Sequence, residues 1–172
     1  AGFAVTGTID KNKIVTIPNA IDSSEFHPRN YSFALRKKWL GDARTPFLLY
    51  VGRLIKQKGL KYLLESMPVV LESFPDAKLI FVGRGNDQKK LQEQAKKLGL
   101  EKNVVFKGFI DEEELKTAFA SCDLFVLSSL WEVLPIAILE AMSSGKPIVC
   151  TDAGGDAELV ADGVNGFVVP KR

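Results

Sequence analysis

The stretch "KLIFVGRGNDQKKLQEQAKKLGLEKNVVFKG", from Lys78 to Gly108, decides the fold of this 172-residue chain. It begins and ends with apolar runs, and the polar stretch between them has a helical pattern that Asn86 or Asp87 can cap and Gly99 can end. Both apolar runs are continuous rather than alternating, which is typical of parallel strands covered on both faces. The stretch therefore predicts a strand, a helix and a parallel strand.

The same rhythm continues on both sides of this stretch. The expected strands span 47–52, 78–83, 103–108, 124–129, 147–151 and 166–169. The expected helices span 58–74, 86–99, 111–122, 135–144 and 156–162. Pro68 should kink the first helix, and Asp111 with Glu114 has the spacing of a capping box. Strands that alternate with helices predict an α/β domain with a doubly wound, Rossmann-like parallel sheet.

Composition excludes several classes of protein. Hydrophobic residues make up 46% of the chain, which is too many for a disordered protein, and the net charge of +2 gives no field that favours nucleic acid or an acidic membrane. Cys122 and Cys150 lie in apolar runs, so we expect free, buried thiols of a cytoplasmic protein. We find no signal peptide and no apolar run long enough to span a bilayer.

The first part of the chain has a different character. "KIVTIPNAI" (13–21) has the composition of a strand, and "DSSEFHPRN" (22–30) reads as a polar linker in which His27, the one histidine, faces solvent. We therefore expect residues 1–44 to be an interdomain linker-like segment and the start of a domain, and residues 45–172 to be the domain proper. Because both ends look cut, we expect a piece of a longer protein.

Ligands of doubly wound sheets bind beyond the carboxyl ends of the strands, so the residues after each apolar run hold the functional information. Arg53 follows one strand, and Lys58 stands where the next helix begins. A guanidinium and an ammonium there suit phosphate oxygens, although solvated surface cations are an equally good interpretation. Gly83 and Gly85 resemble part of a dinucleotide fingerprint without its third glycine, and favour a tight turn near a ligand.

Two glutamates stand out in the stretch from 129 to 151. Glu132 belongs to a loop at the carboxyl edge of the sheet, and Glu140 lies among apolar residues in the following helix. A carboxylate can grip the vicinal hydroxyls of a sugar by accepting two hydrogen bonds. The alternative is that Glu140 lies on a narrow solvated face. The Gly154–Gly155 loop after the next strand suits an anion, a sugar or a plain turn.

Together these residues form a recognisable pattern. The chain resembles the C-terminal, nucleotide-sugar-binding domain of retaining GT-B glycosyltransferases, the family of glycogen synthases, sucrose synthases and many mannosyl-, glucosyl- and galactosyltransferases. "KIVTIPNAIDSSEFHP" resembles the interdomain signature, with Ala20 where glycine is usual, and "YVGRLIKQKGLKYLLESM" resembles the basic motif. "VVFKGFIDEEELKTAFASCDLFVLSS" and "EVLPIAILEAMSSGKPIVCTDAGGDAELVADGVNGFVV" resemble the segment before the acidic motif and the motif itself.

The resemblance implies a role for each matching residue. Arg53 and Lys58 would bind the donor diphosphate and stabilise the leaving group without a metal, and Glu140 would hold the ribose hydroxyls. Glu132 would face the transferred sugar. The implied catalytic residues are Arg53, Lys58 and Glu132. The implied donor contacts are Gly52, Arg53, Lys58, Gly83, Arg84, Lys107, Gly108, Glu132, Val133, Leu134, Pro135 and Glu140.

The resemblance also sets the expected activity. The donor would be a UDP-, GDP- or ADP-sugar, and the full-length protein would transfer its hexose to an acceptor hydroxyl with retention of configuration. No cofactor is implied. The acceptor domain, the expected partner and the one route to a membrane, lies outside this chain, so the fragment should be inactive. Val133 replaces a usual glycine, which leaves the sugar open. A non-catalytic nucleotide-binding module and a GT-B nucleotide-sugar epimerase are the alternatives.

Overall fold

A computed structural model describes residues 13–15 and 17–171 of the chain. Its strands are β1 (Phe47–Val51), β2 (Lys78–Val82), β3 (Val104–Gly108), β4 (Leu124–Leu127), β5 (Ile148–Thr151) and β6 (Gly166–Val169). Its α-helices are α1 (Phe33–Leu40), α2 (Leu60–Ser73), α3 (Gln88–Lys97), α4 (Glu112–Ser121), α5 (Ile136–Ser143) and α6 (Asp156–Leu159). Short 3₁₀ turns, η2 (Pro28–Asn30) and η3 (Lys56–Lys58), precede α1 and α2.

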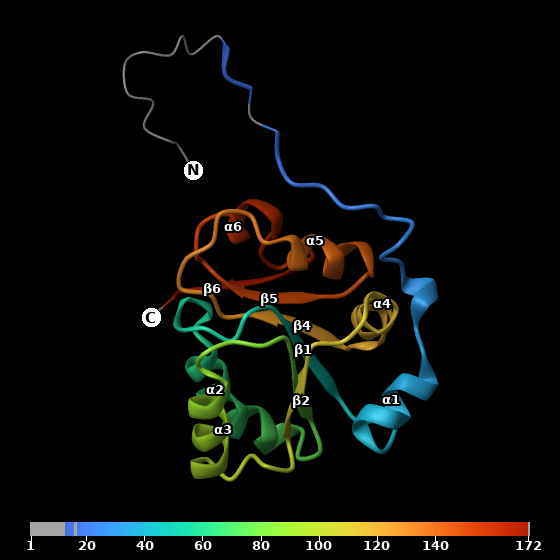
Figure 1. Cartoon of the computed structure of the whole chain (residues 1–172), viewed down its shortest axis with the longest axis vertical. Coiled ribbons are helices and arrows are strands. Elements are labelled where there is room, and N and C mark those ends of the chain that lie inside the picture. Colours follow the sequence, from blue (N-terminus) through green and yellow to red (C-terminus); the bar gives the residue numbers. More distant parts are fainter. Residues whose placement is uncertain (1–12, 16, 172) are drawn as a thin grey trace.

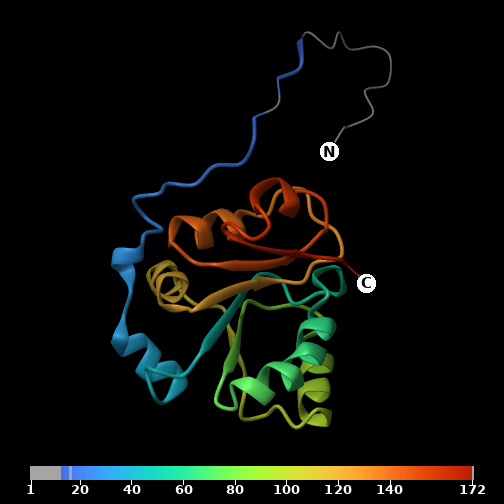
Figure 2. The ribbon, with the colours of Figure 1, turned by 180° about the vertical axis from the view of Figure 1, so that it is seen from behind.

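The strands form one six-stranded sheet in the order β3-β2-β1-β4-β5-β6, and every pair is parallel. Helices α2 and α3 lie together on one face, while α1, α4 and α5 follow one another along the other face (Figures 1 and 2). This is the doubly wound α/β arrangement predicted from the sequence. The strand order reverses direction between β1 and β4, so this is the switch point at which such sheets bind ligands.

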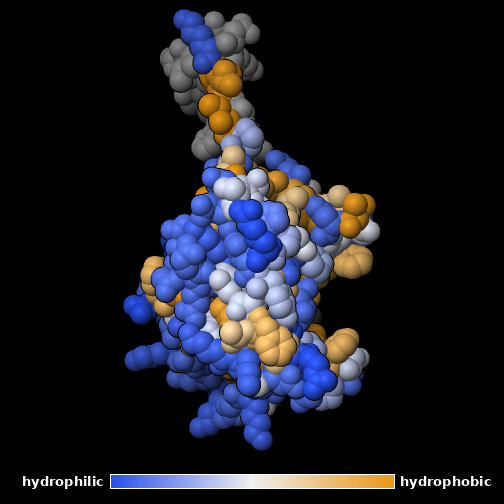
Figure 3. Space-filling model, turned by 90° about the vertical axis from the view of Figure 1, so that its right-hand side faces the viewer, coloured by the Kyte–Doolittle hydropathy of each residue, from blue (hydrophilic) through white to orange (hydrophobic). Residues whose placement is uncertain are grey.

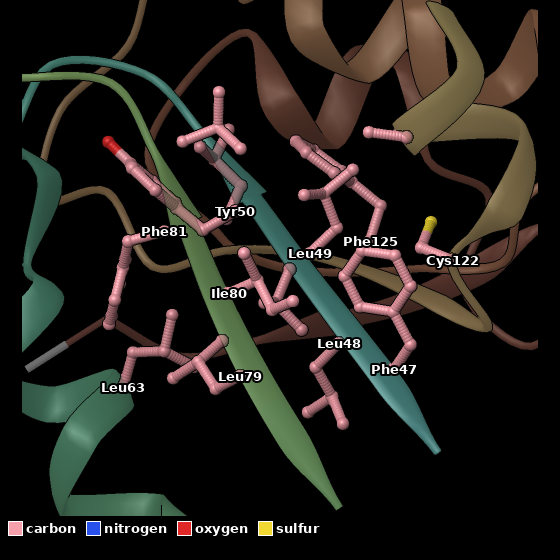
Figure 4. Close-up of a cluster of buried hydrophobic side chains, with 14 of the residues drawn as sticks. Phe47, Leu48, Leu49, Tyr50, Leu63, Leu79, Ile80, Phe81, Cys122 and Phe125 are labelled. Carbon is pink, nitrogen blue, oxygen red and sulfur yellow. The ribbon is translucent and has the colours of Figure 1, made fainter. Parts of the chain in front are cut away.

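Continuous apolar strands fill the interior on both sides of the sheet. In β1, Phe47, Leu49 and Tyr50 are fully buried, and Leu79, Ile80 and Phe81 of β2 beside them are fully buried too (Figure 4). Cys122 and Cys150 are free and buried as predicted, and burial raises the pKa of each thiol to about 12. The residues of the predicted apolar strands therefore form the hydrophobic core, as expected.

The possible strand at 13–21 is wrong for the residues that the structure describes, since 13–15 and 17–21 contain no strand. The segment runs away from the domain, and hydrophobic residues are visible on it (Figure 3). Its apolar side chains Ile14, Val15 and Ile17 are exposed. A β-branched run becomes a strand only where a neighbouring strand accepts its hydrogen bonds, and no described strand does so.

The chain joins the domain well before residue 45. Leu35, Trp39 and Leu40 of α1 are buried, and the Arg36 guanidinium donates to the Asp123 carboxylate at 2.9 and 3.0 Å and to the carbonyls of Ala43, Thr45 and Ser121. His27 is exposed as expected, and its Nδ1 accepts a hydrogen bond from the Arg29 amide.

Helix caps differ in detail from the predicted ones. The Asp111 carboxylate accepts the Glu114 amide at 2.8 Å, which is half of the predicted capping box. The Glu114 carboxylate does not reach back, because it accepts from Trp39 Nε1 at 3.1 Å and Lys38 Nζ at 2.9 Å. Asp87 occupies the N-cap position of α3 without a side-chain cap bond. Helix α2 continues through Pro68.

Candidate functional site

The loops after β1 and β4 are joined at the switch point. The Leu130 amide donates to the Gln57 carbonyl at 2.8 Å, and the Ser128 hydroxyl donates to the Lys58 carbonyl at 3.0 Å. Gly59 begins α2 with φ +61°, and a Cβ there would lie 2.0 Å from the Ser128 carbonyl oxygen. Only glycine allows this close approach, which sets where Lys58 stands.

Lys58, Ser129 and Glu132 form what we call the paired cluster. Lys58 Nζ makes an ion pair with Glu132 Oε1, and the side chains are 14% and 9% exposed. The Ser129 hydroxyl donates to the same oxygen at 2.6 Å, and Ser129 itself is fully buried. The Thr151 hydroxyl of β5 donates to the Ser129 carbonyl. A cation and a carboxylate predicted from the sequence therefore meet, held by a serine that the sequence did not single out.

The turn after Glu132 rests on the loop after β5. The Glu132 amide donates to the Ala153 carbonyl at 2.8 Å. A Cβ at Gly155 would lie 1.5 Å from the Val133 carbonyl oxygen, so the predicted glycine loop serves close backbone packing. Val133 is exposed, whereas Pro135 is buried and precedes α5 without a side-chain cap. The Leu134 carbonyl accepts a hydrogen bond from Asn19 Nδ2 at 3.0 Å.

A second group of predicted residues lines what we call the open hollow. It has a volume of about 290 Å³, at the carboxyl ends of β1 and β2 and beside the loop after β3. Its lining includes Gly52, Arg53, Gly83, Arg84, Phe109 and Ile110. Arg53 and Arg84 are exposed, and among the residues that the structure describes neither guanidinium has a hydrogen bond or an ion pair. A Cβ at Gly83 would lie 2.0 Å from the Gly52 carbonyl oxygen, so glycine keeps these strand ends close.

Lys107 does not join either group. Its Nζ lies 4.7 Å from the centre of the Trp39 ring, and burial lowers its pKa. The side chain is thus engaged with α1, while Gly108 continues into the open-hollow side with φ +70°. The Gly108 carbonyl accepts the Gly83 amide at 2.7 Å, which ties β3 to the glycine turn after β2.

Glu140 is a partly buried carboxyl with no protein partner. It is the fifth residue of α5, and its neighbours Ile138 and Ala141 are fully buried. No hydrogen bond or ion pair within the described ranges engages its carboxylate, and burial raises its pKa to about 7. Helical side chains lean toward the N-terminus, so Glu140 is directed back along α5 toward the Glu132 turn. A carboxyl held this way is prepared to accept hydrogen bonds from a ligand.

Asp156 was not singled out from the sequence. It is the first residue of α6, immediately after Gly155, and is fully buried. Neither carboxylate oxygen has a hydrogen-bond partner among the described residues. Within the part of the chain that the structure describes, no group of three or more His, Cys, Asp or Glu could hold a metal ion. The described residues also contain no helix that is long and apolar enough to cross a membrane.

Comparisons with known proteins agree with this arrangement. The family model described as Glycosyl transferases group 1 matches residues 32–172. The chain is 37% identical to a GDP-mannose-dependent alpha-mannosyltransferase of Corynebacterium glutamicum, over 92% of this chain and 36% of that protein. The chain spans less than half the length of the curated relatives it matches.

Solved structures match as well. The chain is 32% identical to Anabaena HepE in complex with UDP-glucose, with a TM-score of 0.77 over 89% of this chain and 42% of that one. It is 28% identical to the C-terminal domain of a glycosyl transferase group 1 family protein from Francisella tularensis, with a TM-score of 0.73 over 89% of this chain and 81% of that one.

Proposed function

This chain belongs to the glycosyl transferases group 1 family, and we propose that it is the part of a retaining hexosyltransferase that binds the nucleoside-diphosphate sugar. The observation that carries the proposal is the ion pair between Lys58 and Glu132 at the switch point of the sheet, beside the unpaired Arg53. Solvated surface cations, the alternative interpretation of these residues, would not include a lysine that is 14% exposed.

In this proposal Arg53 and Lys58 bind the donor diphosphate. A guanidinium without a protein partner retains all of its donors for phosphate oxygens, and an ammonium adds a compact positive charge. Negative charge grows on the diphosphate as the bond to the sugar breaks, so fixed cations stabilise the transition state more than the ground state. The positive end of the α5 helix dipole favours the same charge.

The remaining residues hold the two ends of the donor. Glu140 accepts hydrogen bonds from the ribose hydroxyls, and Glu132 with the turn of Val133, Leu134 and Pro135 faces the transferred sugar. Gly83, Arg84 and the Lys107–Gly108 edge lie on the side of the nucleoside. Since relatives are named for GDP-mannose and UDP-glucose, we propose a UDP-, GDP- or ADP-hexose as donor and no metal.

We also propose that residues 1–44 are a linker-like segment with the start of the domain, and that residues 45–172 form the donor domain. The acceptor domain would belong to the rest of the full-length protein, so the isolated chain should not transfer sugar. Turnover by the 172-residue chain with donor and a simple acceptor would contradict this.

The decisive experiment measures ligand affinity of the full-length protein by calorimetry. Arg53→Gln and Lys58→Gln should each weaken binding of a nucleoside diphosphate by about ten- to a hundredfold, because one charge-assisted contact is lost. Binding of the matching nucleoside, which has no phosphates, should change little. Equal losses for both ligands would indicate a folding defect. An unchanged diphosphate affinity would contradict the proposal.

A thermodynamic cycle tests Glu140 separately. Glu140→Gln should weaken nucleoside diphosphate binding by about 1–2 kcal/mol, and a dideoxyribose ligand should lose a similar amount with the unmodified protein. The two changes together should cost little more than either one alone, because they remove the same contact. Simple additivity would show that Glu140 does not touch the ribose.

A further inference from the structure

Asp156 is a buried carboxyl group that the proposed donor contacts do not use. Its side chain is fully buried, and both oxygens lack a hydrogen-bond partner. Burying an ionised carboxylate without a partner is costly. Such a group is therefore protonated, or it is stabilised when a partner binds. Buried polar groups that support the fold are usually satisfied by protein hydrogen bonds, as Ser121 and Arg36 are.

The backbone ties the loop that leads to this carboxyl to the turn that contains Glu132. Asp156 follows Gly155, which packs against the Val133 carbonyl, and the Glu132 amide donates to Ala153 in the same loop. The groups that act on its carboxyl are Glu132 from the β4–α5 turn, Lys58 from η3, and Asp152 after β5. Burial, and after it the charge of this carboxyl, raises the pKa of the Cys150 thiol of β5.

We infer that Asp156 is a positioning residue of the donor site, and that its buried carboxyl sets how strongly Lys58 attracts the donor diphosphate. The inference rests on the proposed function, in which Lys58 binds that diphosphate. Asp156 acts through Lys58 and Glu132, and it has no contact with donor or acceptor.

Electrostatics gives the mechanism. When Asp156 carries a proton, Lys58 has one nearby counter-charge, Glu132, and a diphosphate can share the ammonium with it. When Asp156 loses its proton to solvent, Lys58 lies near two carboxylates, and the site repels an anion more strongly. Burial, the first cause, together with the charge of Glu132, raises the pKa of Asp156 to about 7, so both forms occur near neutral pH. Donor affinity should therefore fall as pH rises through 7.

The test measures the affinity of the full-length protein for an intact nucleotide sugar between pH 5.5 and 8.5. A nucleotide sugar is the right probe because its diphosphate is esterified at both ends, so it lacks the terminal phosphate proton that titrates near pH 6. Each protein is measured with Glu140→Gln in place, because Glu140 is a second carboxyl of the donor site whose pKa is about 7. In this background, binding should be about three- to tenfold weaker at the high end. Asp156→Asn, which keeps the shape without the titration, should retain the low-pH affinity and lose most of this dependence.

Asp152→Asn is the matched control, because it removes a carboxylate from the same loop at an exposed position. It should keep the fall in affinity, with the midpoint at slightly lower pH, since the Asp152 charge contributes to the raised pKa of Asp156. If Asp156→Asn does not fold, Asp156→Ser supplies a second uncharged side chain for the same measurement, and circular dichroism establishes which variants are folded.

The outcomes separate the two proposals. If Lys58→Gln weakens binding but Asp156→Asn keeps the full pH dependence, Asp156 has no electrostatic role and the inference is overturned. An equal loss of affinity at every pH in Asp156→Asn would also overturn it, since this is the result of a purely structural role. If Lys58→Gln has no effect on nucleotide-sugar binding, the proposed function fails first, and the inference fails with it.

Discussion

The paired cluster and the open hollow lie at one edge of the same sheet, yet they hold their cations in opposite ways. Lys58 is almost buried and is neutralised by Glu132 before any ligand arrives. Arg53 and Arg84 are exposed, with no hydrogen-bond or ion-pair partner among the described residues. We infer from this difference that Lys58 contributes to folding as well as to the proposed binding, whereas Arg53 and Arg84 can contribute only to binding. Substitutions should therefore separate these contributions.

The largest effect should come from substitution of Gly59, whose close packing on Ser128 positions Lys58 in the paired cluster. Gly59→Ala would place a Cβ 2.0 Å from the Ser128 carbonyl, so we expect a loss of about 4 kcal/mol in the free energy of unfolding or no folded protein. Gly99→Ala is the control, because its φ of +70° is similar and nothing lies within 4 Å of the added carbon. It should cost about 1 kcal/mol. Urea unfolding measures the stability of the two variants. Equal losses would show that the packing of Gly59 on the Ser128 carbonyl does not contribute to stability.

Breaking the ion pair should have the next largest effect on stability. Lys58→Gln leaves a carboxylate that is 9% exposed, with Ser129 as its one remaining hydrogen-bond partner in the described part of the chain. It should cost about 2–3 kcal/mol in the free energy of unfolding. Glu132→Gln added to Lys58→Gln should restore part of this loss, because no unpaired charge remains. A Lys58→Gln protein as stable as the unmodified one would mean that the pair is solvated.

A smaller effect concerns Glu140, which belongs to neither group. Its pKa of about 7 lies above the ordinary value near 4.3, so the folded chain binds more protons than the unfolded chain between these values. The free energy of unfolding should therefore fall as pH rises from about 4 to about 7. Glu140→Gln should remove a fall of about 1–2 kcal/mol, measured by urea unfolding at pH 4.5 and pH 7.5. Parallel pH profiles of the two proteins would contradict the raised pKa.

The smallest effect is expected in the open hollow. Arg53→Gln and Arg84→Gln should each change the free energy of unfolding by less than about 0.5 kcal/mol. The reason is that these exposed guanidinium groups make no hydrogen bond or ion pair with the described residues. Arg53→Gln should still weaken diphosphate binding. A clear loss of stability in either variant would mean that the hollow is organised by its arginines, and the contrast with the paired cluster would disappear.

Much of the fold could be predicted because its strands are apolar on both faces, and each one ends at a glycine or a polar turn. The same reasoning fails at 13–21, where the composition suits a strand but no described strand is available to pair with it. It also fails to anticipate that Glu114 bonds to Trp39, since α1 and α4 are brought together only by the tertiary fold.

The candidate site was predictable in its residue types and less so in its contacts. Spacing along the chain brought out Lys58 and Glu132, but their direct pairing depends on the Gly59 contact with Ser128, which no local pattern encodes. Lys107 lies near the carboxyl end of β3, as predicted, yet its side chain packs on Trp39. Asp156 has the sequence context of an ordinary helix start, and only packing against the Glu132 turn reveals that it is buried.

The strand order has a consequence for how the site assembles in time. Strands β1, β2 and β3 follow one another in the chain, and one crossover that contains a single α-helix joins each pair. In contrast, β1 meets β4 only after the long segment between Val51 and Leu124 has been closed. Loop closure makes such distant pairing slower than local pairing. The open hollow belongs entirely to the local half, so its glycine and arginine residues can come together first. The contact of Lys58 with Glu132 requires the two halves of the sheet to dock, so we expect the switch point to form after the open hollow.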